Sequence, residues 1–274
     1  MQYYLKNKIK NAKYLVIGAG SGLSTAAGFI YDGKKFYDNF KYMEDLYGYH
    51  DMYTASFHDF SSDEAFYGYF SKFIYLNRYE TGALPLYQKL VNFLKDKNYF
   101  VITTNVDHQF QKAGINKEKL FYTQGDYGLF QCPTPCHKKT YDNKDVILKM
   151  IDNQIDHKVP SYLLPRCPIC KKVMIPSLRG GSYFVEDRGW YDAKNKYIKF
   201  LNDAKDNETV FLELGVGYNT PGIIKYPFME MTKNFKDAIY ICVNKDESYI
   251  DDDIKDKSYF IKDDLNNFID ELVK

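Results

Sequence analysis

Two signals are nearly absent from this chain of 274 residues: an excess of charge of one sign and a long apolar run. The 37 Lys and Arg residues balance 36 Asp and Glu residues, for a net charge of +1, so no strong field attracts nucleic acid or an acidic membrane. No stretch approaches the roughly 18 apolar residues of a membrane-spanning helix. The apolar run at 13–17 is too late and too short for a signal peptide. These absences predict a cytoplasmic protein without nucleic-acid or membrane partners.

Cysteine is scarce, with five in the chain, yet four of the five fall in two close pairs. In a reducing compartment such pairs favour a metal over disulfides. Two pairs separated by a loop suit tetrahedral Zn²⁺, and four thiolates would close the site and make it structural. His137 and His157 lie in the same segment and are alternative ligands, although each is more often a surface residue. The predicted zinc ligands are Cys132, Cys136, Cys167 and Cys170.

Histidine is also scarce, and the five histidines form no H-E-x-x-H motif and suggest no Cys–His dyad. The chain has only one Trp but 27 Tyr and 20 Phe. Aromatic residues can stack on nucleic-acid bases, but that use needs basic clusters nearby. Here the aromatic residues are spread along the whole chain, so we expect most of them to form the core.

Short apolar runs that end in glycine or polar residues alternate with segments of helical periodicity. This alternation predicts an α/β fold with a Rossmann-like, doubly wound parallel sheet. Ligands of such sheets bind outside the carboxyl ends of the strands. The expected strands are KYLVI (13–17), YFVITTN (99–105), TVFLELGVG (209–217), AIYICVN (238–244) and SYFIK (258–262).

The domain organisation predicted from these patterns is one unit, 1–274, with a small helical and zinc-binding domain inserted. Residues 31–81 carry helical periodicity without strand signals, which indicates a helical insertion. Residues 129–176 contain the cysteine pairs and form the expected zinc module. The Rossmann-like α/β domain is then assembled from about 1–30, 82–128 and 177–274.

Two strand ends carry motifs suited to a nucleotide. In GAGSGLSTAAG (18–28), glycines let the backbone approach a phosphate at a helix N-terminus, although a plain tight turn explains them too. In TTNVDHQF (103–110), Asn105 and Asp107 alternate with Val106, so both side chains can face one side. Such a pair can bind a carboxamide, or hold a water and a sugar hydroxyl. Helix capping is the alternative role.

Together these motifs resemble those of the sirtuins. SGLSTAAG is similar to their G-A-G-x-S-x-x-S-G element, TTNVD to T-Q-N-I-D, LGVGYNTP to the G-T-S strand end and ICVNKD to the I-N strand end. The resemblance covers nearly the whole chain in order. It implies NAD as co-substrate and a structural zinc. The NAD-binding residues that it implies are Ala19, Gly20, Ser21, Gly22, Ser24, Thr104, Asn105, Asp107, Gln124, Gly215, Val216, Gly217 and Asn244.

Three departures from the sirtuin pattern concern the reaction. Gln124-Gly125 stands where sirtuins carry the His-Gly of their general base. FIYDGKKFYDNF (29–40) replaces the P-D-F-R segment of the cofactor loop. MIPSLRGGSYF (174–184) replaces the stretch that lines the acyl-lysine channel and brings in Arg179. A guanidinium suits a phosphate, a ribose or a carboxylate better than an acylated lysine.

This combination resembles the class M sirtuins, the macrodomain-linked branch. The resemblance implies mono-ADP-ribosyl transfer to a lipoylated carrier related to the glycine-cleavage H protein. A macrodomain hydrolase that reverses the mark and a lipoate ligase are the implied functional partners. Asn105 and Asp107 would hold the nicotinamide riboside, while Gln124 and Arg179 would shape the ribose and acceptor side. The alternatives are a deacylase, an NAD glycohydrolase, and a module that binds NAD or ADP-ribose without catalysis.

Overall fold

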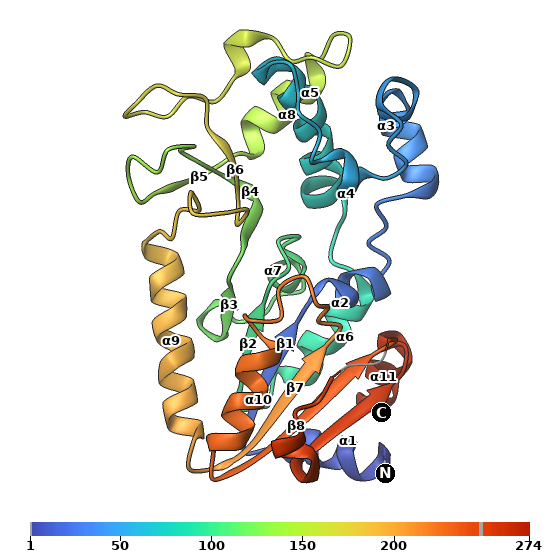
Figure 1. The fold of residues 1–274 in the computed structure, drawn as a ribbon, viewed down its shortest axis with the longest axis vertical. Coiled ribbons are helices and arrows are strands. Elements are labelled where there is room, and N and C mark those ends of the chain that lie inside the picture. The colour runs from blue at the N-terminus through green and yellow to red at the C-terminus, as the bar shows by residue number, and fades with distance from the viewer. Residues whose placement is uncertain (1, 247–248) are drawn as a thin grey trace. The chain divides into compact units, whose positions relative to one another are not determined.

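The chain divides into two compact units in a computed structural model that describes residues 2–246 and 249–274. Each unit is assembled from separate stretches of sequence, as the colours of Figure 1 show. The first unit comprises Met1–Gly28, Ala83–Gln124 and Arg188–Lys274. The second comprises Phe29–Gly82 and Gly125–Asp187.

The first unit is built on a six-stranded sheet in the order β3-β2-β1-β7-β8-β9, with every neighbouring pair parallel. The predicted α/β fold with a parallel sheet is therefore confirmed. All five expected strands are present, and the short edge strand β3 joins them. The strands are β1 (Tyr14–Ala19), β2 (Tyr99–Thr103), β3 (Leu120–Tyr122), β7 (Glu208–Leu214), β8 (Asp237–Asn244) and β9 (Ser258–Lys262).

Helices cover both faces of this sheet, because successive strand side chains point to opposite sides. In β1, Leu15 and Ile17 pack into one apolar cluster with α1, α6 and α11, whereas Val16 packs into the other with α9 and α10. No helix of residues 2–246 and 249–274 is both long and apolar enough to cross a membrane. The helices of this unit are α1 (Gln2–Asn11), α2 (Ser21–Ala26), α6 (Pro85–Leu94), α7 (Gln109–Lys112), α9 (Arg188–Ala204), α10 (Lys225–Asn234) and α11 (Leu265–Leu272), with 3₁₀ turns at Lys117–Lys119 and Asp252–Lys257.

The second unit combines helices with a three-stranded antiparallel sheet in the order β5-β4-β6. Within the predicted helical insertion, α5 is followed directly by a π-helix at Tyr75–Glu80. Strand β6 pairs with β4. The chain between β6 and Asp187 therefore belongs to the second unit. Its elements are α3 (Gly33–Tyr47), α4 (Met52–Ala55), α5 (Asp63–Ile74), β4 (Gly125–Gln131), β5 (Thr140–Asp142), α8 (Lys144–Asp152), a 3₁₀ turn (Ser161–Leu163) and β6 (Ile175–Leu178).

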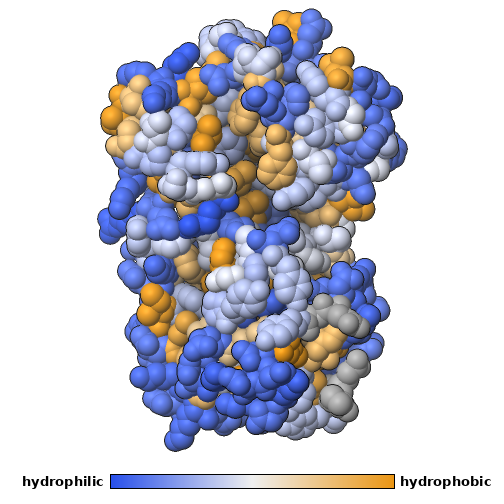
Figure 2. Space-filling model, in the orientation of Figure 1, coloured by the Kyte–Doolittle hydropathy of each residue, from blue (hydrophilic) through white to orange (hydrophobic). Residues whose placement is uncertain are grey.

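Aromatic side chains form much of the buried core of the second unit, as the composition predicts. Phe36, Phe40, Tyr67 and Tyr69 are completely buried, and Phe40 and Tyr69 lie 4.8 Å apart between ring centroids. On the face shown in Figure 2, apolar residues appear as separate groups among hydrophilic ones. Single exposed apolar residues are normal on a protein surface.

Candidate functional site

Asn105 is the central polar residue at the carboxyl end of β2. Its Nδ2 lies 2.9 Å from the Gly20 carbonyl oxygen, 3.0 Å from Ser24 Oγ and 3.1 Å from the Tyr87 hydroxyl. Its backbone N–H donates to Thr103 Oγ1 at 3.0 Å. These donations fix the plane of the amide. The acceptor Oδ1, on the opposite side of the amide group, is thereby oriented for a ligand.

Asp107 is buried beside this amide, with 5% of its surface exposed. Its Oδ2 accepts a hydrogen bond from the Ser24 hydroxyl, and its Oδ1 accepts one from the Gln109 backbone N–H at 3.0 Å. A buried carboxylate is costly unless hydrogen bonds compensate it, and these bonds do so. The structure thus brings the predicted residues Ser24, Asn105 and Asp107 into one hydrogen-bonded group.

Tyr87 is a member of this group that the sequence does not single out. It lies on α6, is completely buried, and packs edge-on against Phe110 with ring centroids 4.9 Å apart. Its hydroxyl is 2.8 Å from Ser24 Oγ, in addition to its contact with Asn105. In an amphipathic helix a tyrosine on the apolar face looks like an ordinary core residue, so periodicity alone cannot reveal its polar role.

The glycines of the first turn serve close packing of two loops at the strand ends. Gly20 N–H donates to the Leu214 carbonyl at 3.1 Å, and Gly22 N–H donates to the Gly215 carbonyl at 2.9 Å. Gly215 has φ = 61°, the left-handed region that favours glycine. Two of the N–H groups that the sequence offers to a phosphate are therefore engaged within the protein. The turn after β1 is thus held by hydrogen bonds against the end of β7 and the loop that follows it.

Replacing Gly22 with alanine is expected to destabilise the first unit by about 1–3 kcal/mol, the usual cost of overpacking. A Cβ at this position would lie 2.8 Å from both Cα and O of Gly215, which are backbone atoms that cannot rotate away. Urea unfolding measures the change. Gly217→Ala is the matched control in the facing loop, since its Cβ would meet no atom within 4 Å. Equal stability of the two variants would contradict this packing.

A fully buried ion pair supports the loop after β7. Lys225 and Glu213 are both 0% exposed and are paired through Nζ and Oε1. Glu213 Oε2 accepts from the Tyr240 hydroxyl at 2.6 Å, and Oε1 accepts from Cys242 Sγ at 3.3 Å. Burial, reinforced by these neighbours, raises the pKa of the Tyr240 phenol far above its usual value. The cluster fixes the start of α10 against the sheet.

Asn244 ends β8 on the same edge of the sheet. Its Nδ2 donates to the Val216 carbonyl at 3.3 Å, and its Oδ1 accepts from the Lys245 backbone N–H at 2.9 Å. Directly after β2, the Thr104 N–H donates to the carbonyl of Ala19, at the end of β1, at 3.1 Å. Backbone pairing across the parallel strands thus brings three of the predicted NAD-binding segments, at the ends of β1, β2 and β7, next to one another. The fourth segment, at the end of β8, lies beside the end of β7 because these two strands are paired.

The two residues that depart from the sirtuin pattern lie in different units. Gln124 is half-buried at the end of the first unit's middle stretch, between β3 and β4. Arg179 follows β6 in the second unit, where its guanidinium binds Glu186 Oε1 at 2.6 Å and lies 4.5 Å from the centre of the Phe184 ring. The side chain of Arg179 is one-third exposed. An arginine held in this way presents a fixed cation.

The four predicted metal ligands converge in the second unit. Their sulfur atoms all lie within 4.8 Å of one another, and three of the separations are 3.4, 3.5 and 3.6 Å. Zn–S bonds of about 2.3 Å in a tetrahedron place sulfurs about 3.8 Å apart. The donor set and its spacing therefore fit one structural zinc ion. The ligands are Cys132, Cys136, Cys167 and Cys170.

The surroundings shift the thiols of the cluster in opposite directions. Burial and the hydrogen bonds with the other three sulfurs raise the pKa of Cys136 to about 12, whereas Cys132 is shifted toward the thiolate. Burial opposes ionisation of Cys132, but the backbone N–H groups of Cys136 and Thr134 outweigh it and lower the pKa of its thiol to about 6. His137 does not complete the ligand set. Its Nδ1 lies 3.2 Å from Cys136 Sγ while its Nε2 lies 2.8 Å from the Tyr141 hydroxyl. Hydrogen bonds of this kind orient metal ligands.

Comparison with known proteins shows which proteins the chain resembles. No family model matches it. It is 35% identical over 266 residues to a protein ADP-ribosyltransferase of Staphylococcus aureus, covering 97% of this chain and 84% of that protein. It is 31% identical over 231 residues to a probable bifunctional ADP-ribose hydrolase/ADP-ribosyltransferase of Fusarium oxysporum, covering 80% of this chain and 38% of that protein.

Solved structures agree on the fold. Sir2Tm bound to a propionylated peptide superposes with a TM-score of 0.60 at 18% identity, covering 99% of this chain and 96% of that one. A Sir2 complex with a p53 peptide and NAD+ gives 0.59 at 17% identity, covering 99% and 97%. These identities support the sirtuin fold alone. With the similarity to the staphylococcal enzyme, they lead to one conclusion: the chain belongs to the family of sirtuin-like, NAD-dependent protein ADP-ribosyltransferases.

Proposed function

We propose that this protein transfers a single ADP-ribose from NAD to a lipoylated carrier protein related to the glycine-cleavage H protein, with release of nicotinamide. One observation carries the proposal. The hydrogen-bonded group of Ser24, Asn105 and Asp107 is complete, while Gln124 stands where the sirtuin pattern has its base. The residues suited to NAD cleavage are present, and the residue needed for deacylation is replaced.

Cleavage of NAD breaks the bond between ribose C1′ and the nicotinamide nitrogen, and the electron pair leaves with nicotinamide. The sugar passes through an oxocarbenium-like state, so the protein must mainly hold it in place and stabilise positive charge. The oriented Oδ1 of Asn105 and the buried carboxylate of Asp107 suit these tasks. The acceptor, a carboxylate or thiolate that is already ionised, then forms the new bond to C1′, and no proton has to be removed from it.

Deacylation needs a further step that this chain is poorly equipped to perform. After an acyl oxygen attacks C1′, a base must activate a ribose hydroxyl, and such a base contributes about 10²–10⁴-fold. The amide of Gln124 cannot take up a proton near neutral pH. Transfer to a carboxylate or thiolate acceptor requires no such base. Arg179, a cation paired with Glu186, also suits an anionic partner better than an acylated lysine.

The test is incubation of the protein with NAD labelled in the adenylate, together with the carrier in lipoylated or unlipoylated form. We expect label on the lipoylated carrier only, in amounts equal to the nicotinamide released. Free ADP-ribose with no labelled carrier would identify an NAD glycohydrolase and refute the transfer. Loss of an acyl group from a peptide at a comparable rate would instead identify a deacylase.

Restoring histidine at position 124 is expected to leave deacylation inefficient. Gln124→His supplies a base, but Arg179 remains as a cation in the segment that lines the acyl-lysine channel in the sirtuin pattern. Steady-state release of acetyl groups from an acetyl-lysine peptide measures the outcome. The double variant Gln124→His/Arg179→Val is the comparison. Efficient deacylation by the single variant would contradict the role proposed for Arg179.

A hydrolase that removes the mark, of the macrodomain type, is the expected functional partner, together with a lipoate ligase that prepares the carrier. The fungal relative supports the first of these, because its name joins an ADP-ribose hydrolase to an ADP-ribosyltransferase in one chain. This chain matches 231 residues, 38% of that protein. Release of label from the modified carrier by a purified macrodomain hydrolase would test the pairing.

A further inference from the structure

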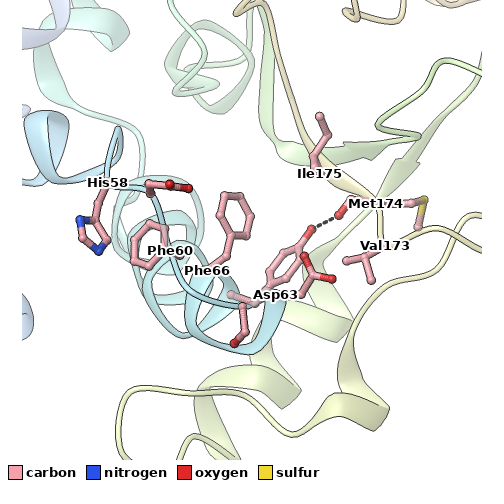
Figure 3. Close-up of a pocket in the computed structure, with 10 residues that line it drawn as sticks. His58, Phe60, Asp63, Phe66, Val173, Met174 and Ile175 are labelled. Carbon is pink, nitrogen blue, oxygen red and sulfur yellow. Dashed lines mark hydrogen bonds between the residues drawn. The ribbon is translucent and has the colours of Figure 1, made fainter.

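A cavity in the second unit contains none of the residues assigned to NAD or zinc. It has a volume of about 510 Å³ and lies between the start of α5 and the chain that enters β6. Figure 3 shows the labelled aromatic residues on one side and Val173, Met174 and Ile175 on the other. The lining residues are His58, Asp59, Phe60, Ser62, Asp63, Phe66, Tyr67, Val173, Met174 and Ile175.

The aromatic wall of this cavity is rigidly held. Phe66 packs edge-on against Phe60 and Tyr67, with ring centroids 5.9 and 5.1 Å away. Tyr67 is completely buried, and its hydroxyl donates to the Met174 carbonyl across the cavity. His58 packs edge-on against Phe60 at 4.8 Å. The ring faces and edges therefore keep their positions without a ligand.

The charge of the lining is negative. Asp59 and Asp63 both line the cavity and are exposed, and the lining includes no Lys or Arg. Within residues 2–246 and 249–274, neither carboxylate forms a hydrogen bond or an ion pair. Asp63 acts on Tyr67 through its charge alone.

Aromatic rings beside free carboxylates are the environment that favours an organic cation with an apolar stem. The ring face attracts the cation, the carboxylate supplies the counter-charge, and the apolar wall covers the methylene groups. We propose that this cavity binds an arginine or lysine side chain of the protein that receives ADP-ribose. It is a docking site separate from the residues that perform the reaction, and it rests on the proposed function for the identity of the partner.

The first test needs no acceptor protein. The peptide acetyl-Gly-Arg-Gly-amide is titrated into the full chain while the aromatic NMR signals are followed. The citrulline peptide, which has nearly the same shape but no charge, is the control ligand. We expect the arginine peptide to shift the Phe60, Phe66 and Tyr67 signals, and the citrulline peptide to bind about tenfold more weakly. Equal binding of the two peptides would overturn the proposal.

The variant for this test is Asp59→Asn/Asp63→Asn, which removes both charges and keeps the shape. We expect it to weaken binding of the arginine peptide about tenfold and to abolish its salt dependence. The matched control is Asp145→Asn/Asp152→Asn on α8, exposed residues of the same unit with the same change in charge. Equal weakening by both variants would show a general charge effect and refute a specific site.

The second test uses the lipoylated carrier. In the variant Asp59→Asn/Asp63→Asn, we expect KM for the carrier to rise about tenfold, while kcat and nicotinamide release without carrier stay unchanged. A fall in kcat with constant KM would overturn the docking role. If no carrier is labelled even by the unaltered protein, the transfer proposal fails, and the peptide titration still decides the cavity. Dissociation of a dimer caused by the variant would assign the cavity to a second copy of the chain and refute the proposal.

Discussion

Replacing Asn105 with alanine is expected to reduce nicotinamide release from NAD by about 100-fold or more. Loss of one oriented polar group that acts in the transition state typically costs 10²–10³-fold. The Asn105 amide is oriented by donations to Gly20, Ser24 and Tyr87, and alanine removes both the oriented Oδ1 and these donations. Steady-state assays of nicotinamide release at saturating NAD measure the effect.

The control is Tyr87→Phe, which removes one hydroxyl from the same group and keeps the packed ring. A single neutral hydrogen bond contributes about 1 kcal/mol, or about fivefold, so this variant should lose at most about fivefold in rate, far less than Asn105→Ala. Circular dichroism and thermal unfolding of both variants separate a loss of chemistry from a loss of folding. A rate near that of the unaltered protein for Asn105→Ala would contradict the proposed role.

Removal of the metal should have the largest effect on stability. We expect purified protein to contain about one zinc ion per chain, and Cys167→Ser to lose it and unfold the second unit. Structural zinc contributes about 10–16 kcal/mol in small zinc domains near pH 7, which is comparable with the whole stability of a typical domain. Elemental analysis gives the metal content, and limited proteolysis locates the unfolding.

Cys242→Ala is the matched control, because this cysteine lies in β8 of the first unit and outside the sulfur cluster. It should leave the zinc content unchanged. Chelation of the unaltered protein should reproduce the proteolysis pattern of Cys167→Ser within the second unit. Protein without zinc that resists proteolysis as well as the loaded form would refute a structural metal.

The sequence was sufficient to predict the parallel sheet because its strands are continuous apolar runs. A strand buried on both faces, such as β7, is apolar at nearly every position and shows no alternation of apolar and polar residues. The cysteine pairs predicted the metal site equally directly, since few other kinds of site use thiols at that spacing. The sheet in the second unit was not predicted. Its strands β5 and β6 are three and four residues long and only partly buried, so neither length nor pattern marks them.

The residues that the sequence analysis singled out lie at strand ends or, like Ser24, in the glycine motif that begins α2, whereas two buried polar residues on other helices escaped it. Asn105 and Asp107 stand at a strand end, where polar residues are conspicuous. Tyr87 contributes its hydroxyl from α6, and Lys225 its ammonium from the start of α10. Both look ordinary in sequence, one as an apolar-face aromatic and the other as a surface cation. Only the distances between elements far apart in the chain reveal that they are polar groups in a buried setting.

The buried pair of Glu213 and Lys225 limits how this family can vary. If either residue alone is replaced by an apolar one, the other charge remains in the interior, at a cost of about 3–5 kcal/mol. Replacing both together with apolar residues of similar volume costs little. We therefore expect the two positions to change together among relatives, from an ion pair to an apolar pair. An alignment with many sequences that hold only one of the two charges would contradict this expectation.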